Sequence, residues 1–562
     1  MRQLIECVPN FSEGLDMNII KQITDEIESV EGVKLLNIDP GKATNRTVVT
    51  FVGTPGEVIN AAFLAIKKAS ELIDMSKHSG EHPRMGATDV CPLVPIANID
   101  MDEVVKYAHK LGERVGKELG IPGYFYEYAA TSPERINLAL VRKGEYEALK
   151  VKLANPKWRP DFGPAEFNKA KHTGATAISA RDFLIAYNVN LNTTSTRRAN
   201  AVAYDIREKG RIKRVGELLS GDIVKDEQGN TLWTHGKLKH VKAIGWFIEE
   251  YGVTQVTMNI TNIKETPLHI AFDQTAKAAD ARGLRATGSE LVGLVPKSAM
   301  LDAGKYFLKK QNRSTGIHES EIIKIAVKSM GLNELSEFDP QNRIIEYMLE
   351  NDGNKKLIDL SLREFADETA SESSAPGGGS ISAYVGTLGI SLASMVANLS
   401  AHKRDWDERW EEFSDWADQG QILKDELLFL VDEDTNSFNK IMESIRLPNG
   451  TETEKKARKE AIDKATKHAI LTPFRVMETC LKSMNMIQKM AEIGNPNSVT
   501  DAGVGALCAR TAVIGAFLNV KINCIDFDAP EFVSDILAKG EVLVAQAKEK
   551  ETEILRITYE RI

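Results

Sequence analysis

The sequence predicts an α/β half, made of two tandem units, followed by an all-α helical bundle. Extended and amphipathic segments follow the order β-α-β-β-α-β over residues 3–96, and the same order returns over residues 183–295. Beyond residue 357 the apolar residues keep helical spacing and give scarcely any strand signal. The chain has 562 residues, which exceeds the roughly 250–300 that one hydrophobic core organises, so several domains are expected.

The first α/β unit is marked by four extended runs and two helical segments. Thr54 is a preferred N-cap residue and Pro55 fits the first position of a helix, so a helix begins here and continues to about residue 73. Two helices against one face of a four-stranded antiparallel sheet form a ferredoxin-like unit, and we expect this fold. The expected strands are 3–8, 33–38, 47–52 and 90–96, and the other helix is 17–30.

The second α/β unit repeats this order of elements without a clear sequence repeat. Tyr251-Gly252 indicates the turn between its second and third strands. Two such units in tandem form a cleft, which is where ligand sites tend to lie. The expected strands are 183–191, 243–249, 253–260 and 288–295, and the expected helices are 197–207 and 267–282.

The remaining segments predict an antiparallel bundle of five or six helices. The uncharged run 373–402 is long enough to span a membrane, but its glycines and hydroxyl side chains favour a helix buried inside the bundle. The expected helices are 359–369, 381–402, 408–434, 455–490, 502–521 and 530–559. We place the domains at 1–178, 179–330 and 356–562, with a linker at 331–355.

The composition indicates a globular protein with 42% apolar and 27% charged residues. A net charge of -9 disfavours a general attraction to nucleic acid or to an anionic membrane, so neither partner is expected. The five cysteines lack any Cys-x-x-Cys pair, which favours a reducing compartment over disulfides or a zinc ribbon. Glu6 and Pro9 interrupt the apolar run that a secretory signal needs, so a cytoplasmic location is expected.

The richest polar segment of the α/β half is HSGEHPRMGATD at 78–89. Its H-x-x-E-H pattern fits an inverted zincin, but Gly80 and Pro83 oppose the helix that such a zinc site needs. We therefore expect a loop without metal. His82, Arg84 and Asp89 supply an imidazole, a fixed cation and a carboxylate, a set suited to proton transfer beside an anionic substrate, and His82 is the expected general acid and base.

Two further segments carry charge near predicted strand ends. Asp39-Pro40 and Asn45-Arg46 place an acid and a cation where both could face the cleft, although Asp-Pro pairs are also common turn formers. A cationic stretch with one aromatic residue could bind a flat anionic ligand or serve as an exposed linker. It comprises Gly163, Pro164, Ala165, Glu166, Phe167, Asn168, Lys169, Ala170, Lys171 and His172.

Three segments of the helical half are candidates for binding or proton transfer. Ser374-Ala375-Pro376 leads into Gly377, Gly378, Gly379 and Ser380, where exposed N–H groups at a helix start favour carboxylate or phosphate, although a flexible linker is the alternative. Asp432 and Asp434 flank Glu433 after an apolar run, as buried general acids or as a solvated helix turn. Asn495 and Asp501 could bind substrate or cap the next helix.

Six motifs occur together in one order: IECVPNFSEG, NRTVVTF, HSGEHPRMGATDVCPLVP, GSELVGLVP, SAPGGGS and GNPNSVTD. In that order they resemble the bifunctional formimidoyltransferase-cyclodeaminase family of folate-dependent histidine breakdown. The resemblance implies transfer of the formimidoyl group from N-formimidoyl-L-glutamate to N5 of tetrahydrofolate. It then implies cyclisation to 5,10-methenyltetrahydrofolate with release of ammonia.

The resemblance also implies roles for particular residues and for partners. His82 matches the family's catalytic histidine, residues 163–172 match its folate-binding segment, and Asp39, Arg46 or Arg84 would contact substrate. The bundle's aspartate would be Asp432 or Asp434, while Gly377–Ser380, Asn495 and Asp501 would bind folate or substrate. Polyglutamylated tetrahydrofolate would be the co-substrate, without metal, in a homo-oligomer. Two alternatives stay open: a folate-binding scaffold with inactive sites, and a metalloamidase that uses His78 and His82.

Overall fold

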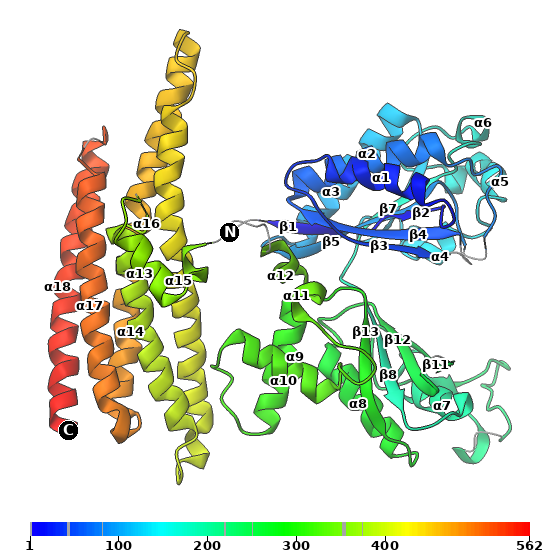
Figure 1. Ribbon diagram of the computed structural model, residues 1–562. Helices are drawn as coiled ribbons and strands as arrows, with labels where there is room; N and C mark the ends of the chain where they lie inside the picture. Colours follow the sequence, from blue (N-terminus) through cyan, green and yellow to red (C-terminus); the bar gives the residue numbers. More distant parts are fainter. Residues whose placement is uncertain are drawn as a thin grey trace. The chain divides into compact units, whose positions relative to one another are not determined.

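The structure is a computed structural model, drawn in Figure 1. It describes residues 3–41, 45–80, 83–217, 221–249, 251–350, 356–373, 375–525 and 527–562. The chain forms two compact units. The first comprises residues 1–302 and 330–351, and the second comprises 303–329 and 352–562.

The first sheet of the first unit has seven strands in the order β3-β4-β1/β2-β5-β7-β6. The strands β3, β4, β1 and β5 are antiparallel neighbours, which confirms the predicted ferredoxin-like order. Two strands pair in parallel beyond β5 and extend this sheet. The bounds are β1 (Leu4–Cys7), β2 (Asn10–Phe11), β3 (Lys34–Gly41), β4 (Arg46–Gly53), β5 (Thr88–Ala97), β6 (Gly123–Glu127) and β7 (Thr176–Ala180).

One face of this sheet is covered by the helices α1 (Met17–Glu28) and α2 (Pro55–Leu72). Alternate strand residues such as Ile5, Cys7 and Phe51 are fully buried in the core that these helices close, as expected for a side-chain period of two. Helix α2 begins at Pro55, as predicted, and the Thr54 amide donates to Glu57 Oε2 at 3.2 Å. Helix α3 (Met101–Arg114) packs on β5, β6 and β7.

The second sheet of the first unit is antiparallel in the order β11-β12-β8-β13, the same ferredoxin-like order. Tyr187 on its central strand is fully buried and donates to Ser289 Oγ at 2.8 Å. A small arm, which the sequence pattern does not predict, lies between α7 and β11. The bounds are β8 (Ile185–Leu191), α7 (Thr196–Ile206), β9 (Arg211–Ile212), β10 (Trp233–Thr234), β11 (Val241–Ile248), β12 (Val253–Ile260), α8 (Leu268–Asp280) and β13 (Ala286–Val292).

Residues 331–355, which we expected to form a linker, contribute helices to the first unit. They contain α11 (Pro340–Arg343) and α12 (Ile345–Glu350), and residues up to 351 belong to that unit. Ile344 and Ile345 are fully buried, and the Ile345 amide donates to the Val295 carbonyl at 3.1 Å. Before them, α9 (Lys297–Lys310) and α10 (Glu319–Met330) follow the second sheet in the chain.

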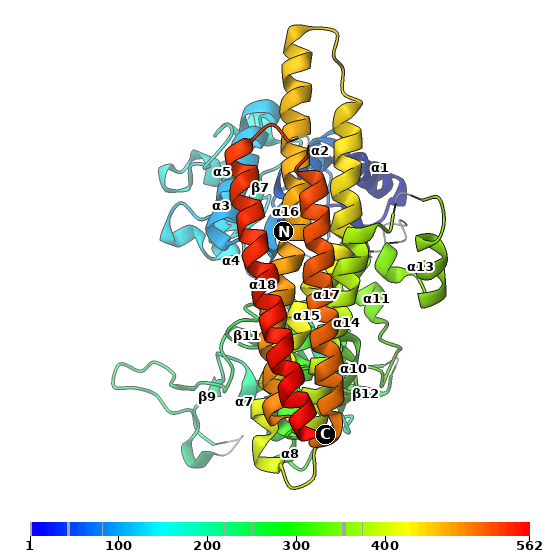
Figure 2. The same ribbon diagram turned by 90° about the vertical axis from the view of Figure 1, so that its left-hand side faces the viewer.

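The second unit is the predicted helical bundle, whose long helices run side by side in Figure 2. Helix α14 packs against α15, α16 and α17, and α18 packs on α16 and α17. A Cβ at Gly389 would lie 2.9 Å from the Gly505 carbonyl oxygen, so α14 and α17 cross at a pair of glycines. The bounds are α13 (Leu362–Thr369), α14 (Gly378–Ala401), α15 (Trp410–Ile445), α16 (Glu452–Ile493), α17 (Val499–Asn523) and α18 (Pro530–Arg561).

Two segments of the bundle are long and apolar enough to cross a membrane by length and composition alone. They are Gly378–Ala401 and Pro496–Asn523, with 61% and 50% of their apolar windows buried inside the bundle. A buried core helix satisfies the same two criteria. Their length and composition are therefore weak evidence for a membrane span.

Candidate functional site

The first candidate site is the loop at 78–89, although its predicted catalytic residue, His82, lies outside the residues that the structure describes. The residues on either side of it are described. His78 Nδ1 accepts from Arg84 Nε at 3.3 Å, so its proton sits on Nε2, which donates to the Asn45 carbonyl at 3.0 Å. Asn45 Nδ2 also donates to the Ser79 carbonyl at 2.9 Å. The loop that carries His82 is thus held to the start of β4.

Arg84 is fully engaged by neighbouring protein groups. Its guanidinium donates to both oxygens of Glu147 at 2.7 and 2.9 Å and to Glu145 Oε2 at 3.1 Å, besides the His78 contacts. Such a forked pair fixes both position and orientation. In this arrangement Arg84 positions the loop. Its Nε and both terminal nitrogens already donate to protein groups, so few of its N–H donors remain for the substrate carboxylate that we expected it to bind. The pair Glu145 and Glu147 was missed because neither is close to Arg84 in sequence.

Asp89 is buried at the start of β5 beside two cations. Its Oδ1 accepts from the Met85 amide at 2.9 Å, and Arg142 lies 2.8 Å from Oδ2 without hydrogen-bond alignment. Burial raises the pKa of Asp89 to about 6, while Arg142, the Met85 amide and Arg46 act against that rise. A carboxyl with this pKa exchanges protons near neutral pH.

Arg46 and Asp39 lie on the neighbouring strands β4 and β3, which extend beyond the predicted ranges 47–52 and 33–38 to include them. Burial lowers the pKa of Arg46, and the charges of Asp89 and Asp39 partly restore it. Asp39 is exposed on β3 opposite Val48, within a strand that continues to Gly41. The Asp-Pro pair is therefore part of the ladder and not the turn that we considered as its alternative.

The predicted folate-binding segment, residues 163–172, is divided by the structure into two parts. Gly163 has a φ of +75°, and a Cβ there would lie 2.2 Å from the Ile121 carbonyl oxygen, so this end is constrained by packing. At the other end, the His172 carbonyl accepts from the Met75 amide at 2.8 Å, and the ring of Phe167 lies 6.1 Å from that of Tyr146. Tyr146 in turn donates its amide to the Arg84 carbonyl at 3.0 Å. Phe167 to His172 thus border the loop.

A cavity of about 790 Å³ lies between the two α/β subdomains of the first unit. Its lining includes Glu127 and Tyr128 from the first subdomain and His240, Lys242 and Asn262 from the second. The expected cleft therefore exists. The predicted site residues of the 78–89 loop are not among its lining residues.

The second candidate site, in the bundle, joins Asp434 to the start of α14. Asp434 Oδ2 accepts from the Ser380 amide at 2.9 Å and from its hydroxyl at 3.1 Å. A Cβ at Gly379 would lie 2.1 Å from Asp434 Oδ1, so only glycine permits this approach. Burial raises the pKa of Asp434, although both Ser380 hydrogen bonds oppose the rise. The glycine segment is thus the start of a buried helix that receives a carboxylate.

Asp432 and Glu433 point to other neighbours, which separates the two candidate aspartates. Asp432 Oδ1 accepts from the Leu357 amide at 2.8 Å, and burial raises its pKa. Glu433 lies 2.7 Å from His468 Nε2 and 3.2 Å from Lys440. Asp434 is therefore the carboxyl that meets the glycine segment. No motif in the sequence indicated His468.

Asn495 and Asp501 lie far along the bundle from Ser380. The Asn495 amide donates to Ser400 Oγ at 2.8 Å, and Ser400 is about 30 Å from Ser380 along α14 at 1.5 Å per residue. Asn495 Oδ1 accepts from the Asn497 amide at 3.2 Å, as the capping alternative expects. Asp501 lies in the first turn of α17. Within one chain the structure does not bring these two residues to Asp434.

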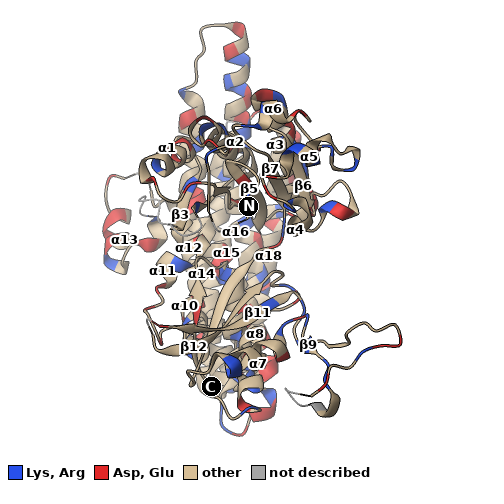
Figure 3. Ribbon diagram, turned by 90° about the vertical axis from the view of Figure 1, so that its right-hand side faces the viewer, with Lys and Arg blue, Asp and Glu red and all other residues tan. Residues whose placement is uncertain are grey.

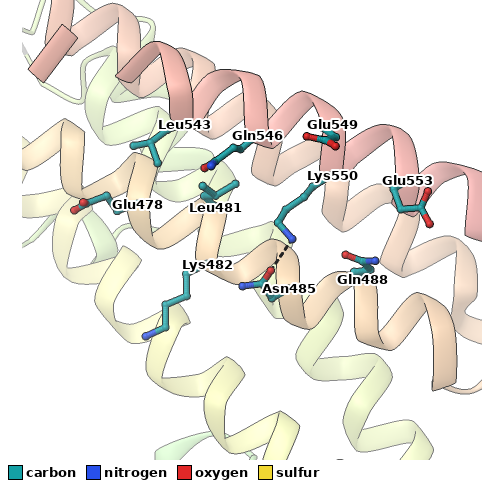
Figure 4. A pocket seen from close by; sticks show the side chains of 10 residues that line it. All are labelled: Glu478, Leu481, Lys482, Asn485, Gln488, Leu543, Gln546, Glu549, Lys550 and Glu553. Atoms are coloured by element: carbon teal, nitrogen blue, oxygen red, sulfur yellow. Dashed lines mark hydrogen bonds between the residues drawn. The ribbon is translucent and has the colours of Figure 1, made fainter. Parts of the chain in front are cut away.

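A groove of about 670 Å³ between α16 and α18 involves none of these residues (Figure 4). Lys550 spans it and donates to Asn485 Oδ1 at 2.7 Å. In the part of the chain that the structure describes, no group of three or more His, Cys, Asp and Glu side chains is arranged to hold a metal ion.

The fold and these two sites define a class of two-part protein. An α/β pair, whose 78–89 loop is held by contacts of His78 and Arg84, precedes a helical bundle with a half-buried aspartate, Asp434. Family models match in the same order. The formiminotransferase N-terminal subdomain matches residues 4–181, the formiminotransferase domain matches 186–350, and the formiminotransferase-cyclodeaminase model matches 361–541.

Some relatives match the whole chain, and others match the α/β half alone. A formimidoyltransferase-cyclodeaminase from Dictyostelium discoideum is 40% identical over 100% of both chains, and one from Mus musculus is 40% identical over 98% of this chain and 97% of its own. A glutamate formimidoyltransferase from Thermoplasma acidophilum is 42% identical over 54% of this chain and 92% of its own. This chain belongs to the formimidoyltransferase-cyclodeaminase family.

Proposed function

We propose that this protein is a bifunctional folate enzyme with both activities of the family. It transfers the formimidoyl group from N-formimidoyl-L-glutamate to N5 of tetrahydrofolate, and then cyclises the product to 5,10-methenyltetrahydrofolate with loss of ammonia. The observation that carries the proposal is the similarity to formimidoyltransferase-cyclodeaminases at about 40% identity over the whole chain. A relative that covers only the α/β half is a glutamate formimidoyltransferase.

In the first reaction, N5 of tetrahydrofolate attacks the formimidoyl carbon and forms a tetrahedral centre. The bond to the glutamate nitrogen then breaks, and this nitrogen leaves readily only when it is protonated. We assign that proton transfer to His82. Arg84, held by Glu147 and His78, is a positioning residue for the loop. Arg46, with Asp39 beside it, is the candidate to hold a substrate carboxylate.

In the second reaction, N10 of the folate attacks the same carbon, the five-membered ring closes, and ammonia leaves. The leaving nitrogen again needs a proton. Burial raises the pKa of both Asp432 and Asp434. We assign Asp434 as the donor because it meets the start of α14, whereas Asp432 accepts from the Leu357 amide. Gly377–Ser380 would bind the folate next to it.

The co-substrate is tetrahydrofolate, in a polyglutamylated form, and it would contact Phe167–His172 beside the loop. Both proton transfers are assigned to protein side chains, so the proposal requires no metal. We further propose that the enzyme acts in histidine degradation in the cytoplasm as a homo-oligomer, without nucleic-acid or membrane partners. Asn495 and Asp501 would bind substrate only at the far end of the bundle from Ser380.

The test is an assay of the full-length protein with N-formimidoyl-L-glutamate and tetrahydrofolate, in which glutamate, ammonia and methenyltetrahydrofolate are followed together. All three products are expected. His82→Ala should abolish transfer yet still cyclise supplied 5-formimidoyltetrahydrofolate, and Asp434→Asn should stop at that compound. Glutamate release without folate, sensitive to chelators, would establish a metalloamidase, and folate binding without products would establish a scaffold.

A further inference from the structure

A cationic pocket lies beside the β9–β10 arm of the first unit, away from both candidate sites. It has a volume of about 560 Å³, within the range of sites for small molecules. Figure 3 shows Lys and Arg on the arm that carries β9. The charged side chains of its lining are Arg207, Arg211, Lys213, Arg214, Arg282 and Asp205.

The cations exceed the carboxylates of this lining by four positive charges, in a chain whose net charge is -9. Asp205 is already shared, because its carboxylate pairs with Arg211 and accepts from Arg282 Nε at 2.5 Å. No other acidic side chain lines the pocket among the residues that the structure describes. The remaining positive charge has no carboxylate of this pocket to offset it.

Backbone contacts hold two of the guanidinium groups in place. Arg207 Nε donates to the Gly210 carbonyl at 2.9 Å, and its guanidinium lies 4.0 Å from the centre of the Tyr204 ring. Arg214 donates through one terminal nitrogen to the Gly221 carbonyl at 2.7 Å. A guanidinium has five N–H donors, so each group keeps donors for a ligand while its position is fixed.

Lys213 differs from these arginines because its ammonium group makes no ion pair or hydrogen bond within the described parts of the chain. It is exposed, and it comes directly before Arg214 at the rim of the pocket. Trp233 also lines the pocket. It lies on β10 and pairs with Ile212 on β9, the other strand of the arm. The pocket therefore combines fixed guanidinium donors, an unpaired ammonium and an aromatic ring.

We propose that this pocket binds a small molecule that carries a diphosphate group. A phosphate has about two negative charges and three acceptor oxygens, so two linked phosphates match four uncompensated cations better than a single carboxylate does. Trp233 and Tyr204 provide flat surfaces for a ring attached to the diphosphate. Neither half of the proposed folate chemistry uses these residues.

The experiment is calorimetric titration of the full-length protein with pyrophosphate and, separately, with adenosine diphosphate. The variant Lys213→Gln/Arg214→Gln removes two pocket cations and should weaken binding of pyrophosphate at least about tenfold. Lys225→Gln/Lys237→Gln is the matched control, because both lysines are exposed on the arm outside the pocket lining, and it should bind as the wild type does.

A second variant distinguishes loss of binding from misfolding of the arm. Lys213→Glu changes only a side chain without partners, so it should weaken binding while the melting temperature stays unchanged. Tighter binding of adenosine diphosphate than of pyrophosphate, lost in Trp233→Leu, would identify a nucleotide as the ligand, and equal affinities would identify free diphosphate. The proposal fails if pyrophosphate does not bind at millimolar concentration, if the control variant weakens binding equally, or if an RNA oligonucleotide binds and pyrophosphate does not displace it.

Discussion

Asp434 on α15 accepts two hydrogen bonds from Ser380 at the start of α14, through the amide at 2.9 Å and the hydroxyl at 3.1 Å. The carboxylate thus occupies the helix terminus where unpaired N–H groups favour negative charge. Burial acts in the opposite sense and raises the pKa of Asp434. A group balanced between these effects can hold a proton and release it, as a general acid must.

Gly379→Ala should disable the cyclodeaminase, because its Cβ would lie 2.1 Å from Asp434 Oδ1 and displace the carboxylate. We expect a loss of about 10²-fold in cyclisation of supplied 5-formimidoyltetrahydrofolate, with transferase activity unchanged. Gly450→Ala is the matched control, since this glycine lies in the bundle outside the proposed folate-binding segment and the nearest atom to its Cβ, at 3.3 Å, is Oε2 of the Glu454 side chain. Equal losses in both variants would contradict the assigned role of Asp434.

The pH dependence of cyclisation should report the protonation of Asp434. Because the proposed donor must be protonated and its pKa is raised, kcat should fall as pH rises through that pKa. Asp434→Asn should lower kcat by about 10²- to 10⁴-fold and remove this limb of the profile. Asp432→Asn should keep the limb, since Asp432 is bonded to the Leu357 amide. A limb that disappears with Asp432 instead would reverse the assignment.

Arg84→Lys should impair the transferase alone. Lysine cannot reproduce the forked contact with both oxygens of Glu147, at 2.7 and 2.9 Å, while it contacts His78. We expect at least about a tenfold loss of transferase kcat/KM, since misplaced catalytic groups cost about that much or more, and normal cyclodeaminase activity.

The exposed pair of Lys157 with Glu134, at 3.3 Å, provides the control for this experiment. Glu134→Gln breaks a surface ion pair of the same subdomain and should leave both activities intact. A double-mutant cycle between Arg84→Ala and Glu147→Ala should show coupling, because the two side chains are in direct contact. Independent effects would mean that Arg84 does not act through Glu147.

The first unit should lose stability as pH rises from about 4.5 to 7. Burial raises the pKa of Glu6 to about 7 from an ordinary value of 4.5, although Arg181 opposes the rise. The folded state therefore holds a proton that the unfolded state has released, which destabilises the fold at higher pH by on the order of 3 kcal/mol for a group that is almost fully buried.

Thermal melting at several pH values tests this expectation. Glu6→Gln should flatten the decrease in melting temperature between pH 5 and about 7.5, because glutamine has no proton to release. Glu31→Gln, on an exposed turn, should keep the wild-type slope. An unchanged slope in the Glu6 variant would place the titrating group elsewhere.

Local patterns predicted most of the architecture. The periodicity of two or 3.6 residues located the four strands of each ferredoxin-like sheet and the five long helices, because burial of one face imposes that spacing. Shorter strands were expected after residue 101, but the place of β6 and β7 in the sheet could not be predicted, because β7 pairs in parallel with segments that are distant in sequence. Residues 331–355 looked like a linker because no long periodic segment marks them, yet Ile344 and Ile345 are buried.

The site was predictable in its residue types and less so in its contacts. The motif at 78–89 indicated a functional loop, but the glutamates that hold Arg84 lie 61 and 63 residues away, where no local pattern connects them. Asp432 and Asp434 face different directions, because positions two apart on a helix do not share a face. The sequence does not show which of the two directions faces α14. Only the packing of α14 on α15 decides which one meets Ser380.

The close approach of Gly389 on α14 to Gly505 on α17 determines how α14 is tilted against its neighbour. Helix α14 is continuous from Gly378 to Ala401, so a tilt of the helix axis at Gly389 also moves the start of the helix. Gly379 lies about 15 Å from Gly389 along the axis, so a tilt of about 4° would carry Ser380 and its neighbours about 1 Å. A bulky side chain at Gly389, remote from Asp434, would thus misalign the acid through geometry alone.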